Sequence, residues 1–250
     1  MSFDVVADAY WQFMGRFSEP LAASFLRFAG VRAGGRVLDV GCGPGALTAR
    51  LDSASVSAVD PSETFVAAAR SRLPGADIRQ ATAEDLPFDD DIFDAALAQL
   101  VVHFMTDPVA GLREMGRVTR PGGVVAACVW DHAGGGSPLA AFWRAVNSLD
   151  PGAHDESGLA GAREGHLTEL LSAAGLRDIA AGALTVRVSF PSFDDWWAPY
   201  TLGVGPAGDY VKNLDPSRRS ALRDRCASLL PPSGPFEIEA TAWAASGRAS

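Results

Sequence analysis

The chain has 250 residues, of which 48% are hydrophobic, so it can bury a substantial core. No run approaches the roughly 18 apolar residues of a membrane helix, and the N-terminus lacks the basic and apolar regions of a signal peptide. The net charge of −9 disfavours a nucleic-acid partner, because phosphate binding generally leaves a basic face.

The first half of the chain alternates short apolar runs with helical patterns, after an aromatic-rich helical segment at residues 1–29. Strands are predicted at 36–40, at 55–60, within 76–88, within 92–104 and at 124–130. Helices are predicted at about 46–51, 61–73 and 107–118. This rhythm is typical of a doubly wound α/β fold with a parallel sheet, which binds ligands at the carboxyl ends of its strands.

The rhythm changes after residue 130, where a glycine-rich stretch holds one helical pattern near 139–149. A helix is predicted at 166–176, a strand at 183–190, mostly helical sequence at 194–230 and a last strand at 236–248. We expect one domain over residues 1–250. Its core would comprise about 30–130, 166–190 and 236–248, and two helical cap insertions would occupy about 131–165 and 194–230.

A glycine-rich loop directly follows the first strand. The sequence from Gly41 to Ala46 fits the dinucleotide pattern G-x-G-x-x-G/A, in which glycine lets the backbone approach a ligand closely. Asp60 ends the second strand, 19 positions after Gly41, where a carboxylate can accept hydrogen bonds from both ribose hydroxyls. These features indicate a ribose-bearing nucleotide, and they leave an NAD-dependent oxidoreductase as an alternative.

Two residues of this region favour a cationic ligand over a dinucleotide. Asp39 stands two positions before the first glycine, where its carboxylate would repel a pyrophosphate and attract an ammonium or a sulfonium. Pro44 occupies the loop where a dinucleotide would need a free N–H. The other interpretation of Asp39 is that it only caps a turn.

Four segments in order resemble motifs of the class I S-adenosylmethionine-dependent methyltransferases, small-molecule type: "VLDVGCGPG", "VSAVDPS", "ATAEDLPFDDDIFDAAL" and "LREMGRVTRPGG". The resemblance extends from about residue 3 to 130. It implies a Rossmann-like, seven-stranded, mostly parallel sheet. It also implies S-adenosylmethionine as cofactor and S-adenosylhomocysteine as product.

The resemblance also implies a cofactor site. Asp39, Gly41 and Gly43 would line the methionine and ribose part, with Cys42 as the spacer in this loop. Asp60 would hold the ribose hydroxyls, with Pro61 and Ser62 beside the adenine. Further contacts would come from Ala83 and Glu84 at the adenine, from Gln99 and Leu100 under the methionine, and from Tyr10 or Arg16 at the methionine carboxylate.

One position departs from the family pattern, and one N-terminal interpretation stays open. Relatives often have an acid where this chain has Thr82, which puts the adenine contact in doubt. Tyr10 and Arg16 could instead belong to an amphipathic helix packed on the core.

Histidine supplies the candidate base for a reaction that needs one. His103, placed by the pattern at the end of the fourth strand, has an ordinary pKa that suits proton removal near neutral pH. A structural histidine beneath the site is the equal alternative, and His132 could face the same opening. No His, Cys or Asp cluster has metal-ligand spacing, so we expect no metal. The aromatic residues at 196–200 would form either an acceptor wall or cap packing.

The sequence therefore predicts a methyltransferase that acts on a small molecule by in-line transfer. Neither a nucleic acid nor a membrane is expected as a partner. The odd number of cysteines, without an export signal, indicates reduced thiols and a cytoplasmic location. A non-catalytic domain that binds the same cofactor is a further alternative. The acceptor, the atom methylated and the oligomeric state do not follow from the sequence.

Overall fold

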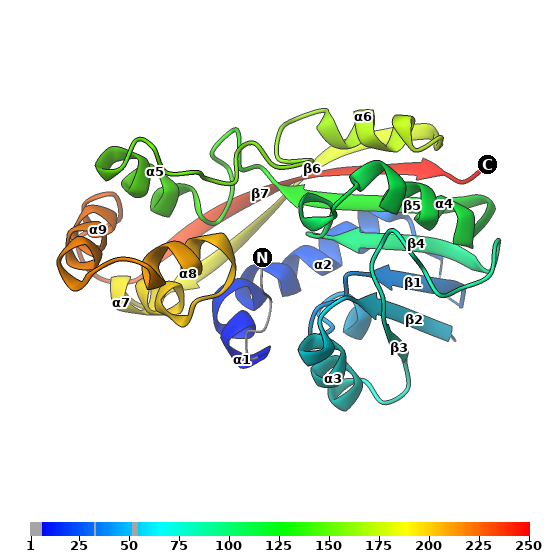
Figure 1. The fold of residues 1–250 in the computed structure, drawn as a ribbon, viewed down its shortest axis with the longest axis horizontal. Coiled ribbons are helices and arrows are strands. Elements are labelled where there is room, and N and C mark those ends of the chain that lie inside the picture. The colour runs from blue at the N-terminus through cyan, green and yellow to red at the C-terminus, as the bar shows by residue number, and fades with distance from the viewer. Residues whose placement is uncertain (1–6, 33, 52–54) are drawn as a thin grey trace.

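The computed structural model describes residues 7–32, 34–51 and 55–250. A seven-stranded sheet with the order β3-β2-β1-β4-β5-β7-β6 runs through the molecule (Figure 1). Neighbouring strands are parallel, except that β7 is antiparallel to both β5 and β6. The strands are β1 (Arg36–Val40), β2 (Ser55–Asp60), β3 (Asp77–Gln80), β4 (Phe93–Gln99), β5 (Thr119–Trp130), β6 (Arg177–Phe190) and β7 (Phe236–Arg248).

Helices connect these strands and extend the chain beyond the sheet. The α-helices are α1 (Ala7–Tyr10), α2 (Arg16–Ala29), α3 (Glu63–Arg72), α4 (Pro108–Val118), α5 (Ala140–Leu149), α6 (His166–Ala173), α7 (Phe193–Trp197), α8 (Gly205–Lys212) and α9 (Pro216–Ser228). The short π- and 3₁₀-helices are η1 (Trp11–Gly15), η2 (Thr48–Arg50), η3 (Val102–Phe104) and η4 (Ala198–Leu202). Ser62 and Asp107 cap α3 and α4 by accepting hydrogen bonds from backbone N–H groups of the first turn.

The predicted seven-stranded, mostly parallel sheet is confirmed, but some local predictions were wrong. The helix expected at about 46–51 is replaced by turns and by η2. Gly45 turns the chain there with φ of 92°, and the Thr48 side chain is bound to Asp39 instead of lying free on a helix. The strands β5 and β6 begin at residues 119 and 177, earlier than expected, because their pairing continues to these residues.

Alternation along the strands distributes the core over both faces of the sheet. Val37 belongs to the same hydrophobic cluster as Phe25 of α2, whereas Leu38 clusters with Leu112 of α4. Successive strand side chains point to opposite faces, so Asp39 lies on the α2 face, like Val37. Order 2-1-4 places the carboxyl end of β1 at the reversal of strand order, where α/β sheets bind ligands.

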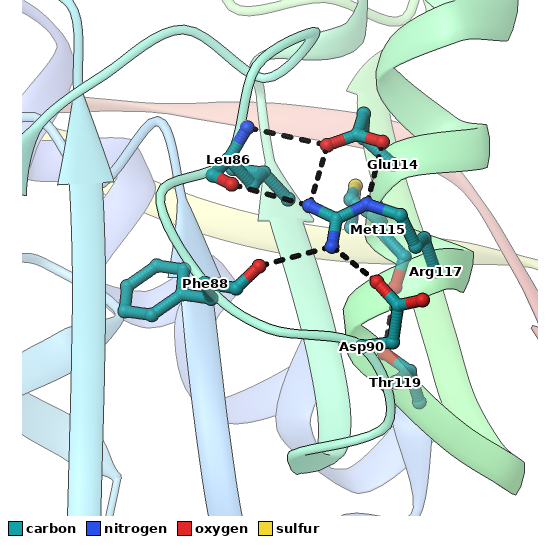
Figure 2. Close-up of polar contacts among 7 residues, drawn as sticks. All are labelled: Leu86, Phe88, Asp90, Glu114, Met115, Arg117 and Thr119. Carbon is teal, nitrogen blue, oxygen red and sulfur yellow. Dashed lines mark hydrogen bonds and ion pairs between the residues drawn. The ribbon is translucent and has the colours of Figure 1, made fainter.

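A polar clamp fixes the loop between β3 and β4 to helix α4 (Figure 2). Arg117 donates hydrogen bonds to the carbonyl oxygens of Leu86 and Phe88 and to the carboxylates of Asp90 and Glu114. Glu114 in turn accepts a hydrogen bond from the Leu86 N–H at 3.3 Å. The clamp therefore holds a loop that has no regular secondary structure of its own.

The helices α5, α7, α8 and α9 gather around one end of the long strands β6 and β7 (Figure 1). They come from the two segments expected to form caps, and the division into core and caps stays a prediction. The aromatic residues Trp196, Trp197 and Tyr200 are buried in the hydrophobic core here, which favours packing over an acceptor wall. Within the part of the chain that the structure describes, no helix is long and apolar enough to cross a membrane.

Candidate active site

The glycine loop closes on its own backbone after β1. The N–H groups of Gly41 and Cys42 both donate to the Val59 carbonyl oxygen, at 2.8 and 2.9 Å. Gly41 has φ of 70°, and a Cβ atom there would lie 2.4 Å from Val101, so neither the backbone nor the space admits a side chain. The loop is therefore a tight turn between β1, β2 and the segment after β4.

Asp60 braces this loop from the end of β2. Its carboxylate accepts hydrogen bonds from the N–H groups of Gly43 at 2.8 Å and Ser62 at 2.9 Å. Burial raises the pKa of Asp60, and these two hydrogen bonds act in the opposite direction. Each carboxylate oxygen has a second lone pair, so two ribose hydroxyls can still be accepted.

Asp39 forms a hydrogen bond within the protein, whereas the sequence analysis expected it to line the cofactor site. It is 1% exposed and accepts a 2.6 Å hydrogen bond from the Thr48 hydroxyl. Burial raises its pKa to about 7. The structure thus gives Asp39 the turn-bracing contact that was its alternative interpretation, and Asp39 does not line the cavity described next.

A cavity, the glycine-loop cavity, lies at the carboxyl ends of β1, β2 and β4. Its lining includes seven residues predicted for the cofactor: Tyr10, Gly41, Gly43, Asp60, Pro61, Gln99 and Leu100. Phe65, Val101 and Phe104 also line it, and the sequence analysis missed them because apolar residues in helices and strand ends resemble ordinary core.

Gln99, which lines the glycine-loop cavity, has one side-chain oxygen without a partner among the described residues. Its side-chain N–H donates to the Ser18 carbonyl oxygen at 2.9 Å. Its Oε1 atom is buried and has no hydrogen-bond partner in the described chain. Such an orphaned oxygen matches a ligand that carries hydrogen-bond donors, such as the ammonium group of S-adenosylmethionine.

Predicted residues that do not line this cavity have other partners. Arg16 forms an ion pair with Asp195 of α7 at 2.6 Å and does not line this cavity, so its contact with the methionine carboxylate stays a prediction. Glu84 accepts hydrogen bonds from Thr106 and Asp107 N–H groups just before α4.

The three remaining predicted cofactor residues have local roles. Cys42 is buried, with its sulfur 3.4 Å from the Gly43 carbonyl oxygen. Ser62 caps α3, and Ala83 packs in the hydrophobic cluster on the α4 side. These residues support the walls of the site, and contact with a bound cofactor stays a prediction for them.

A second cavity, the inner chamber, adjoins the first. Tyr10, Leu100 and Phe104 line both cavities, so they form a common wall. The rest of its lining is mainly apolar and comprises Phe13, Met14, His103, Trp130, His132, Leu139, Glu156, Val204, Gly205, Pro206 and Ala207. His132 and Glu156 also line an outer hollow of about 960 Å³ beside α5, which they separate from the chamber.

His103 of the chamber is buried and His132 is half-buried, and both have lowered pKa values. Burial lowers the pKa of His103 to about 3 and that of His132 to about 4, and the His103 pKa is lowered further by His132. Burial thus gives His103 a lower pKa than the ordinary value assumed from the sequence, and its role as a general base stays a prediction. His103 lies in η3, beyond the strand, where it stays neutral and can accept a hydrogen bond.

Glu156 is a chamber residue that no sequence signal indicated. It accepts a 2.8 Å hydrogen bond from the Trp143 indole N–H, and burial raises its pKa to about 7. It lies in the irregular segment after α5, where only the folded chain brings it to the chamber. In the described ranges, no group of three or more His, Cys, Asp and Glu side chains is placed to hold a metal ion.

Comparison with known proteins identifies the fold around these cavities. Residues 38–127 match the family model described as "Methyltransferase domain". This part of the chain is therefore similar to methyltransferase domains. The matching family typically binds S-adenosylmethionine or S-adenosylhomocysteine, and the glycine-loop cavity is lined by Asp60 and Gln99, whose side chains carry acceptor oxygens that suit such a ligand.

Similar proteins share this domain over part of the chain. An uncharacterized methyltransferase of Mycobacterium tuberculosis is 39% identical over 134 residues, which cover 52% of each protein. A demethylmenaquinone methyltransferase of Clavibacter sepedonicus is 42% identical over 101 residues, or 38% of this chain and 41% of that one. The chain thus spans about half the length, or less, of these curated relatives.

Solved structures share the fold over nearly the whole chain. A putative methyltransferase from Bacillus halodurans has a TM-score of 0.58 at 18% identity and covers 91% of this chain and 97% of its own. A possible histamine N-methyltransferase from Thermotoga maritima has a TM-score of 0.59 at 19% identity, covering 97% and 94%. At such identities the likeness shows the fold.

Proposed function

We propose that this protein is an S-adenosylmethionine-dependent methyltransferase that acts on a small-molecule acceptor by in-line transfer. The observation that carries the proposal is the hydrogen bonding of the glycine loop. The N–H groups of Gly41, Cys42 and Gly43 are all taken by acceptors within the protein, and Pro44 has none.

Because its N–H groups already have acceptors within the protein, this loop is a poor site for a dinucleotide. A pyrophosphate needs free N–H groups or a helix N-terminus, and in the described chain the loop leads into turns and η2. None of the described residues lining the glycine-loop cavity is an arginine or lysine. An oxidoreductase that uses NAD is therefore the weaker candidate, whereas a cofactor that is positive near its reacting atom suits this cavity.

The inner chamber supports catalysis over mere cofactor binding. A non-catalytic domain would have no use for a second, largely apolar cavity that shares Tyr10, Leu100 and Phe104 with the first. S-adenosylmethionine, when bound, supplies a methyl carbon activated by its sulfonium. The residues of the common wall would then align the acceptor with that carbon and exclude water, and such alignment contributes about 7–11 kcal/mol in favourable systems.

Acceptor class and location are part of the same proposal. The curated relatives include a demethylmenaquinone methyltransferase and a malonyl-[acyl-carrier protein] O-methyltransferase, so their names do not agree on one acceptor. The net charge of −9 supports a small molecule over a nucleic acid. The free thiols of three buried cysteines support a reducing, cytoplasmic location.

Calorimetric titration with S-adenosylmethionine, S-adenosylhomocysteine and NADH tests the cofactor. We expect micromolar binding of the first two and none of NADH. Asp60→Ala should weaken binding at least tenfold, because hydrogen bonds to a charged group contribute about 1.5–3 kcal/mol each. Asp89→Ala, which removes an exposed carboxylate, is the control and should bind like the wild type. Tight NADH binding, or no binding of the other two, would refute the proposal.

A further inference from the structure

The inner chamber holds several buried polar atoms that lack partners. His103 Nδ1, Trp130 Nε1 and both ring nitrogens of His132 make no hydrogen bond with any described residue. Buried polar groups in native proteins are nearly always hydrogen-bonded, because leaving them unpaired destabilises the fold. All three side chains line the same chamber, so a ligand in this chamber would lie beside several of these atoms.

The chemistry of these atoms restricts that ligand. The Trp130 indole can only donate a hydrogen bond, whereas a neutral imidazole offers one donor and one acceptor. The matching group must therefore accept from Trp130 and also donate to a histidine nitrogen. A hydroxyl group does both, whereas a carboxylate cannot donate and an ammonium cannot accept.

Charge leads to the same conclusion. Among the described residues around the chamber none is an arginine or lysine, so an anion would be buried without a counter-ion. Glu156 is the one described carboxyl group of the lining, and it already accepts a hydrogen bond from Trp143. The remaining walls are aromatic and aliphatic, which suits a flat apolar skeleton.

We infer that the methyl acceptor is an uncharged hydroxyl compound with a flat apolar skeleton, held in the inner chamber by a hydrogen bond accepted from Trp130 and one donated to His132, which leaves one oxygen lone pair free for the transfer. This rests on the proposed function. The hydroxyl oxygen forms the new O–CH₃ bond while the S–CH₃ bond breaks and its electron pair stays on sulfur. The hydroxyl proton passes to a histidine nitrogen and then to water. A weakly basic imidazole suffices, because an oxygen that gains a methyl group becomes strongly acidic.

Four naphthalene derivatives test the inference on one skeleton: 2-naphthol, 2-methoxynaphthalene, 2-naphthoate and 2-naphthylmethylammonium. Each is titrated into protein saturated with S-adenosylhomocysteine. We expect 2-naphthol to bind about tenfold or more tightly than the other three, as one or two neutral hydrogen bonds allow. With S-adenosylmethionine instead, 2-naphthol should yield 2-methoxynaphthalene, measured by chromatography.

Histidine variants separate hydrogen bonding from a structural role. His132→Leu should abolish the preference for 2-naphthol over 2-methoxynaphthalene, whereas His132→Gln, which keeps a donor and an acceptor, should retain most of it. His154→Leu changes an exposed histidine and should leave the preference intact. All three should bind S-adenosylhomocysteine like the wild type, which shows that they fold.

The outcomes distinguish this inference from the proposed function. Tighter binding of the naphthoate or the ammonium, or no binding of 2-naphthol, overturns the inference while cofactor binding stands. An unchanged preference in His132→Leu also overturns it. Absence of S-adenosylhomocysteine binding by the wild type instead defeats the proposed function.

Discussion

Replacing Arg117 by methionine removes the clamp between α4 and the loop at 86–90 while it keeps most of the side chain's apolar stem. The guanidinium donates five hydrogen bonds, two of them to backbone carbonyl oxygens and two to Glu114. Its side chain is 32% exposed, so water can replace part of what is lost.

The expected loss follows from these contacts. The two carbonyl bonds contribute about 1 kcal/mol each and the bidentate Glu114 pair about 1 kcal/mol, whereas the exposed Asp90 adds little. Unfolding free energy should therefore fall by about 3 kcal/mol, and the melting temperature by roughly 6–12 °C for a chain of this size. Arg117→Lys keeps the charge but not the planar fork, so it should recover only a minor part.

Urea and thermal denaturation at pH 7 measure this difference, with Arg113→Met as the control. Arg113 lies exposed on the same helix, and its replacement should change stability by less than about 0.5 kcal/mol. Arg117 lowers the pKa of Glu114 below its ordinary 4.5. The stabilisation by this pair is thus present above pH 4.5 and is lost as the pH falls through the lowered value.

The difference in unfolding free energy between the wild type and Arg117→Met should therefore become smaller at acidic pH. A variant within 1 kcal/mol of the wild type at pH 7, or a gap that stays constant down to pH 3, would refute this account of the clamp.

Three further predictions concern the glycine loop, the inner chamber and the cysteines. Gly41→Ala should destabilise the protein by more than Gly34→Ala. Both glycines have positive φ, which costs an alanine about 1–2 kcal/mol at either position, but only a Cβ atom at position 41 would also clash with Val101. Equal losses of unfolding free energy in urea denaturation would contradict this prediction. Burial raises the Glu156 pKa from 4.5 to about 7, so wild-type stability should fall as the pH rises through 7. Glu156→Gln should remove this pH dependence, so that its unfolding free energy rises relative to that of the wild type by at most about 3 kcal/mol between pH 5 and 8. If the two proteins' unfolding free energies change with pH in parallel, the prediction is wrong. A thiol reagent should label the native chain slowly and rapidly label three cysteines after denaturation, since all are buried: Cys42, Cys128 and Cys226.

The sequence predicted the sheet and the glycine-loop cavity because both depend on local patterns. Strand-length apolar runs and punctuating glycines place Gly41 and Asp60 at strand ends, and parallel topology then brings strand ends together. The same patterns did not show that Asp39 is held by Thr48 or that Arg16 pairs with Asp195. A pairing between residues 179 positions apart depends on how separate segments pack, and no local signal records it.

The inner chamber illustrates the same limit. Glu156 and the first residues of α8 lie in segments without strong periodicity, and only tertiary packing places them beside His103. Burial also changes how readily His103 takes up a proton, since it lowers the His103 pKa to about 3, below the ordinary value assumed from the sequence. The sequence therefore predicted which residues are candidates for the site, whereas the folded environment determines their protonation and hydrogen bonding.

The common wall of Tyr10, Leu100 and Phe104 has an evolutionary consequence. The cofactor side of this wall is built largely within residues 38–127, the part that matches the family model, whereas most of the chamber's far side comes from outside that range. Substitutions around Leu139, Glu156 or Val204 can therefore remodel the chamber without touching the glycine loop. Under the proposed function, the acceptor side of the wall can thus change in sequence independently of the side that would hold the methyl donor.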